Sequence, residues 1–133
     1  MGRSGSRGRW LALVAALLGW MFDGMEMGLF PLVARSALGE LLHADTGEGV
    51  VGRWYGVVTA AFLVGAATGG VVFGWLGDKL GRVRAMTLSV LTYSLCSGLS
   101  ALSSSPWGLA RLRFLGGLGM GGEWALGVAL VME

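Results

Sequence analysis

Charged residues stand well inside apolar stretches of this 133-residue sequence, where an isolated charge is costly. Asp23 and Glu26 lie three positions apart, a spacing that puts both carboxylates on one face of a helix. Arg113 lies in the last apolar stretch, and Glu123 follows ten positions later. Each carboxylate ionised at membrane depth would cost about 2.5 to 3.5 kcal/mol, so such groups face a partner or a cavity. An acid there can take up a proton, and an arginine can hold an anion.

The composition indicates that these stretches are embedded in lipid. Hydrophobic residues make up 54% of the chain and charged residues 14%, with a mean hydropathy of +0.68, whereas soluble domains carry about 25% charged residues. Because a span needs about 20 mostly apolar residues, the unbroken runs predict an all-α membrane protein with four transmembrane helices in a lipid bilayer. We expect a tail at 1–9 and spans at about 10–30, 55–76, 85–102 and 107–132.

The distribution of Lys and Arg predicts the topology. Three cations precede the first span and three lie in 77–84, against two in 31–54 and none in 103–106. Cytoplasmic segments carry the excess of positive charge. We therefore expect a multi-pass protein of the inner (plasma) membrane with both chain ends in the cytoplasm, a cytoplasmic loop at 77–84 and an external loop at 31–54.

Glycine recurs at helical spacing within the expected spans, and 25 glycines occur in all. Small residues four positions apart let membrane helices approach closely. This pattern predicts helix contacts at Gly65, Gly69, Gly70, Gly117 and Gly121.

Residues 74–84 read Gly-Trp-Leu-Gly-Asp-Lys-Leu-Gly-Arg-Val-Arg. This segment resembles G-x-L-x-D-[RK]-x-G-R-[RK], the loop signature of the major facilitator superfamily between spans two and three. Val83 departs from the second basic position, and Arg84 supplies a cation one place later. The matching positions are Gly74, Leu76, Asp78, Lys79, Gly81 and Arg82.

The loop combines turn residues with charges of both signs. Gly77 and Gly81 permit a tight turn with positive φ. Asp78 can form ion pairs with the cations that break and re-form between two conformations, as in a latch, whereas a plain topology signal would need only the cations. The cations of this expected gating loop are Lys79, Arg82 and Arg84. The resemblance implies that the loop governs the outward-to-inward switch by contacting the second half of the transporter.

Two further segments carry the resemblance. Residues 113–123 match every named position of the fourth-span signature R-x-x-x-G-x-G-x-G-G-E, and residues 23–26 resemble the D-G-x-[DE] element of organic-acid:proton symporters. The glycines also satisfy G-x-G-x-x-G, but no βαβ context supports a dinucleotide site. The resemblance implies the first four spans of a twelve-helix fold, with the remaining helices of the same transporter as partners.

These elements suggest roles for the buried charges. An ionised acid is costly at depth, which favours protonation, so we expect Asp23 and Glu26 to carry the coupling proton. Arg113 would hold the anion or pair with an acid, although Glu26 could instead reach the outer interface and Arg113 could extend to it. Glu123 either faces the central cavity or serves as a structural acid. Glu133 could face the basic loop or be a solvated terminus.

The expected function of the whole protein is secondary active transport, as proton-coupled symport of a small organic acid. A sugar or polyol porter, an exporter, or a non-transporting sensor or assembly subunit remain as alternatives. An enzyme is disfavoured because the sequence lacks a Ser/His/Asp or Cys/His set. We expect no cofactor, no metal and no nucleic acid, with H+ as the coupling ion.

Overall fold

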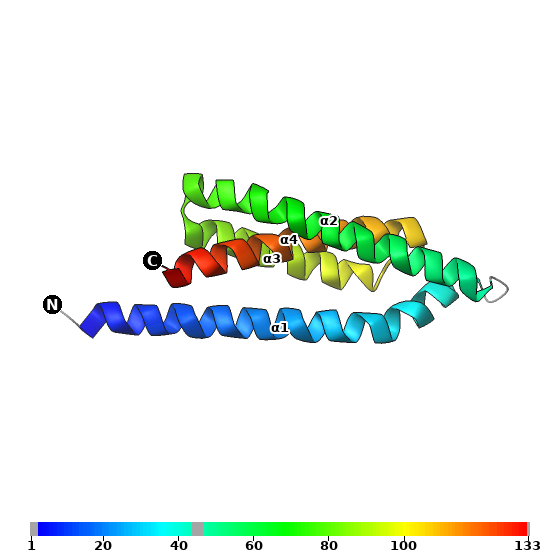
Figure 1. Cartoon of the computed structure of the whole chain (residues 1–133), viewed down its shortest axis with the longest axis horizontal. Coiled ribbons are helices and arrows are strands. Elements are labelled where there is room, and N and C mark those ends of the chain that lie inside the picture. The colour runs from blue at the N-terminus through cyan, green and yellow to red at the C-terminus, as the bar shows by residue number, and fades with distance from the viewer. Residues whose placement is uncertain (1–2, 44–46, 133) are drawn as a thin grey trace.

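The computed structural model describes residues 3–43 and 47–132. Figure 1 shows a bundle of helices that run alternately up and down. The start of α1, the end of α4 and the α2–α3 turn lie at one end of this bundle, which agrees with the expected alternation of sides. The helices are α1 (Arg3–Leu41), α2 (Glu48–Leu80), α3 (Arg82–Ser100) and α4 (Pro106–Met132).

Three of the helices are long and apolar enough to cross a membrane: α1 from Leu13 to Leu41, α2 and α4. Helix α3 has 19 residues, about 28 Å at the usual rise, but it is not among these three apolar helices; it begins with Arg82 and Arg84 and carries several serines and threonines. Several of these hydroxyls bond within the helix, such as Thr87 to the Val83 carbonyl and Thr92 to the Leu88 carbonyl. Its packing against α4 still favours the predicted third span.

Helix α1 is longer than the expected first span. It begins at Arg3, inside the expected tail, and continues through Pro31 to Leu41, so most of the expected 31–54 loop is helical. Proline removes one backbone donor and kinks a helix without always ending it, and α1 bends toward its C-terminal end in Figure 1. Leu38, fully buried with Val58 and Leu109, stabilises this extension.

The expected 77–84 loop is also mostly helical. Only Gly81 separates α2 from α3 in the described chain, and its φ of 90° and ψ of 143° suit glycine alone. The expectation of a turn at Gly77 was wrong. Gly77 is a buried helical residue, and a Cβ there would lie 2.5 Å from Leu126 Cδ2, so this glycine serves helix packing.

The predicted glycine contacts join α2 to α4. A Cβ on Gly65 or Gly69 would overlap the backbone of α4 at Phe114 or Leu118. A Cβ on Gly117 or Gly121 would overlap the backbone of α2 at Phe62 or Ala66. Gly70 takes part more loosely, with the Gly121 carbonyl 3.7 Å from its Cβ position. The two helices therefore meet backbone to backbone.

Helix α4 lies at the centre of the bundle and contacts the three other helices. On its α3 side, the buried Ser89 hydroxyl donates to the Gly119 carbonyl at 2.5 Å. Gly119 has no room for a Cβ beside the backbone of Tyr93. Helix α1 makes far fewer contacts, and it meets α4 through buried polar side chains as well as through the apolar packing of Leu38 on Leu109 and Ala110.

Candidate functional site: a buried ion pair beside a cavity

Helices α1 and α4 bring Glu26 and Arg113 together. An Arg113 terminal nitrogen donates to Glu26 Oε1 at 2.5 Å, and the Ser97 hydroxyl of α3 donates to the same oxygen at 3.1 Å. The Arg113 side chain is only 8% exposed and that of Glu26 21%. Arg113 therefore does not extend to the surface of the described bundle, and the Glu26 carboxylate points into the bundle.

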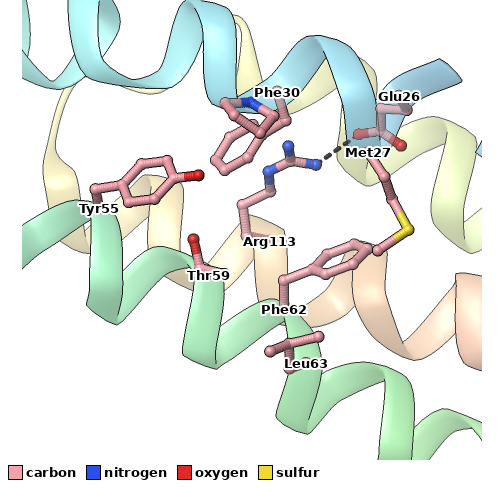
Figure 2. A pocket seen from close by; sticks show the side chains of 9 residues that line it. Glu26, Met27, Phe30, Tyr55, Thr59, Phe62, Leu63 and Arg113 are labelled. Atoms are coloured by element: carbon pink, nitrogen blue, oxygen red, sulfur yellow. Dashed lines mark hydrogen bonds and ion pairs between the residues drawn. The ribbon is translucent and has the colours of Figure 1, made fainter. Parts of the chain in front are cut away.

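Two aromatic rings lie against the Arg113 guanidinium. Its central carbon is 3.5 Å from the Phe30 ring centre and 5.4 Å from that of Phe62, distances at which a cation is attracted to a ring. Figure 2 shows Phe30 and Phe62 on opposite sides of the arginine. Sequence reasoning missed both rings. Phe30 stands four residues after Glu26 on the same helix face, a usable signal, whereas nothing in the sequence singles out Phe62.

A cavity of about 90 Å³ lies beside the ion pair between α1, α2 and α4, large enough for a few water molecules. Three buried polar atoms at this cavity have no hydrogen-bond partner among the residues that the structure describes: Arg113 Nε, Thr59 Oγ1 and Glu26 Oε2. Buried polar groups are normally paired, so a polar occupant would satisfy atoms that the protein leaves unpaired. The cavity is lined by Glu26, Met27, Phe30, Pro31, Tyr55, Thr59, Phe62, Leu63 and Arg113.

The other two acids lie apart from the arginine. Asp23 is 1% exposed and accepts a hydrogen bond from Trp124 Nε1 at 2.8 Å. Glu123, 4% exposed, fits against Gly19 of α1, where a Cβ would overlap its carboxylate, and its charge and that of Asp23 are near enough to interact. Neither acid has an ion-pair partner among the described residues. Sequence reasoning missed Trp124, although it directly follows the signature glutamate.

The expected gating residues lie at the α2–α3 end of the bundle (Figure 1), and none of them lines the cavity. Asp78 and Lys79 are exposed on the last turn of α2, and Lys79 Nζ lies 4.2 Å from the Trp75 ring centre. Arg84 is exposed near the start of α3. Glu133, the expected partner of this loop, lies outside the described residues.

The profile of the Major Facilitator Superfamily matches residues 10–133. The chain belongs to this superfamily. Major facilitator proteins similar to it include a Haemophilus influenzae protein named for metabolite transport, 34% identical over 93% of this chain. Others are a low affinity inorganic phosphate transporter of Medicago truncatula (36%, 92% of this chain) and a sialic acid transporter of Escherichia coli (33%, 92%).

The chain spans 25 to 29% of the length of these three relatives. No solved structure gave a significant match. Membership of this family confirms three predictions: a helical part of a larger fold, a multi-pass membrane protein, and a protein that is not an enzyme.

Proposed function

We propose that the complete protein is a secondary active transporter that moves a small organic acid together with a proton. The observation that carries this proposal is the Glu26–Arg113 ion pair, buried at the edge of a cavity with polar atoms left unpaired. Arginine stays charged at any physiological pH. A permanent cation at membrane depth suits an anionic substrate, and two of the similar proteins are named for the transport of anions, phosphate and sialic acid.

The pair offers a direct way to couple the proton to the anion. With Glu26 ionised, the arginine charge is matched and an anion gains little by approaching. Protonation of Glu26 would remove the competing carboxylate charge and leave the guanidinium to the substrate. Proton and anion would then each raise the affinity for the other, as linkage requires. Rocking of two six-helix halves would carry both across the membrane.

Asp23 provides a second place for a proton. It is almost fully buried and lies near Glu123. Its hydrogen-bond donor is the neutral indole of Trp124 rather than a cation. Two carboxylates close together resist being ionised at once. Protonation of Asp23 or Glu123 would therefore lower the cost of burying both acids between α1 and α4 during the transport cycle.

In this proposal H+ is the coupling ion, no cofactor or metal takes part, and the protein lies in the inner (plasma) membrane with its N-terminus in the cytoplasm. The exposed Asp78 and its neighbouring cations act as the latch that the missing helices engage. A sugar or polyol would need no buried arginine, and a sensor or assembly subunit would need no proton carrier. Export is the same chemistry with the gradient reversed.

Uptake into proteoliposomes by the complete transporter tests the proposal with sialic acid, inorganic phosphate, glucose and sorbitol as probes. We expect an imposed proton gradient to drive accumulation of the acid. Asp23→Asn should abolish this accumulation but retain exchange of the acid across the membrane. Accumulation by Asp23→Asn with unchanged pH dependence would show that Asp23 is no proton carrier, and uptake of sorbitol or glucose alone would refute acid transport.

A further inference from the structure

Thr59 differs from the other threonines of the described helices. In a helix the threonine hydroxyl ordinarily bonds a carbonyl three or four residues earlier. Thr68 does so with Val64 at 2.8 Å, and Thr87 and Thr92 behave alike. The Thr59 hydroxyl is buried without a partner in 3–43 and 47–132, although the carbonyl of Tyr55 stands in the equivalent position on its own helix. Its hydroxyl therefore remains available to something else.

The second unpaired donor of the cavity belongs to Arg113. One end of the guanidinium binds Glu26, while Nε has no partner. Figure 2 shows the hydroxyls of Thr59 and Tyr55 on the Nε side of the arginine, away from Glu26. The cavity is therefore polarised, with an acceptor engaged at one end and donors directed into the other.

We propose that Thr59 and the Nε edge of Arg113 form a subsite for an oxyanion, the carboxylate of the transported acid. This inference rests on the proposed function and names the residues that read the substrate. One carboxylate oxygen can accept from Nε–H and the other from the threonine O–H, a charge-assisted arrangement. Tyr55, at the edge of the same space, can supply a third donor.

Two features favour an anion over a neutral or cationic group. Phe30 and Phe62 cover the faces of the guanidinium and leave its edge exposed to the cavity. Glu26 Oε2, the unpaired carboxylate oxygen at this cavity, points away from that edge in Figure 2. A volume of about 90 Å³ admits the acidic end of a substrate rather than a whole metabolite. The remainder of the molecule would lie against helices of the complete transporter.

Thr59→Val tests the subsite because valine keeps the shape of threonine and removes its hydroxyl. Thr68→Val is the matched control, since it makes the same change on the same helix at a hydroxyl that bonds Val64. Thr59→Ser is a second control, because serine keeps the hydroxyl and loses only the methyl group. Uptake by the complete transporter is measured as a function of concentration for sialic acid, inorganic phosphate, glucose and sorbitol, which separates KM from kcat.

We expect Thr59→Val to raise the KM for the transported oxyanion roughly tenfold, as loss of a hydrogen bond to a charged group implies. Thr68→Val and Thr59→Ser should stay within about twofold of the parent. An unchanged KM in Thr59→Val would overturn the subsite and leave the hydroxyl to a bound water. If phosphate alone is carried with this KM pattern, the subsite stands and organic-acid symport fails. Uptake of glucose or sorbitol alone would overturn both.

Discussion

The two contacts that α4 makes with α2 and with α1 are built on opposite principles. Against α2, glycines on both helices remove side chains so that the backbones touch. Against α1, buried polar side chains meet, Glu26 with Arg113 and Asp23 with Trp124, beside an apolar cluster around Leu38. A close backbone contact leaves little freedom of geometry, because moving the two helices closer produces overlap. A contact that depends on carboxylates changes when one of these carboxylates is protonated.

This difference suggests which part of the bundle is rigid and which part adjusts. Helices α2, α3 and α4 share close glycine contacts and a turn of one residue at Gly81. Helix α1 touches this unit less extensively and carries two of the buried acids. We infer that changes in protonation are transmitted as movements of α1 against a fixed α2–α4 pair, which places the cavity at the adjustable boundary.

The largest effect is expected from breaking the rigid contact. Gly121→Ala would put a methyl group into the backbone of α2 at Ala66, and overpacking of this kind costs about 3 kcal/mol. Gly98→Ala is the control, since a Cβ on Gly98 of α3 meets nothing within 4 Å. Thermal unfolding of the complete transporter in detergent should show a lowered Tm for the first and an unchanged or raised Tm for the second. Equal Tm values would mean that α2 and α4 are not held this closely.

A smaller effect is expected at the adjustable contact. Glu26→Gln keeps the size of the side chain and removes its charge. It should lower the free energy of unfolding by about 1.5 kcal/mol, in the range for a hydrogen bond to a charged group. Substrate binding should become independent of pH over the range in which the parent responds, because no titrating carboxylate at position 26 then competes with the substrate for Arg113.

The comparison for this variant is Ser97→Ala, which removes only the second hydrogen bond to Glu26 Oε1. Binding of the transported acid, measured at several pH values, should keep the parent's pH dependence in Ser97→Ala. A Glu26→Gln protein that binds with the same pH dependence as the parent would assign proton coupling elsewhere, with Asp23 and Glu123 as the next acids to test.

The rigid contact could be predicted from sequence because its signal is local. Gly65 and Gly69, like Gly117 and Gly121, mark one face of one helix by spacing alone. The ends of the elements could not be predicted in this way. Apolar runs indicate how much of a helix lies in lipid, not where the helix ends. Helix α1 continues beyond Pro31 because Leu38 packs against other helices.

The candidate site was only half accessible to the sequence. Glu26 and Arg113 could be singled out because they stand inside apolar stretches, where a charge is costly and needs a partner or a cavity. Which side chains surround them depends on how α2 and α3 rotate about α4, and no local pattern records that rotation. Thr59, Phe62 and Ser97 were therefore missed. An unpaired hydroxyl such as that of Thr59 becomes visible only when its neighbours are known.

The smallest effect on stability, within about 0.5 kcal/mol as for other surface changes, is expected for Asp78→Asn at the α2–α3 end of the rigid unit. Asp78 is exposed on the last turn of α2 and loses charge with little change of shape. If it serves as a latch toward helices outside this chain, the variant should bind the acid with the parent's affinity and transport it more slowly. Stopped-flow uptake and equilibrium binding on the same preparation separate these quantities, and a Tm scan confirms an intact fold. Parallel loss of binding and rate would argue for misfolding, and an unchanged rate would remove Asp78 from the switch.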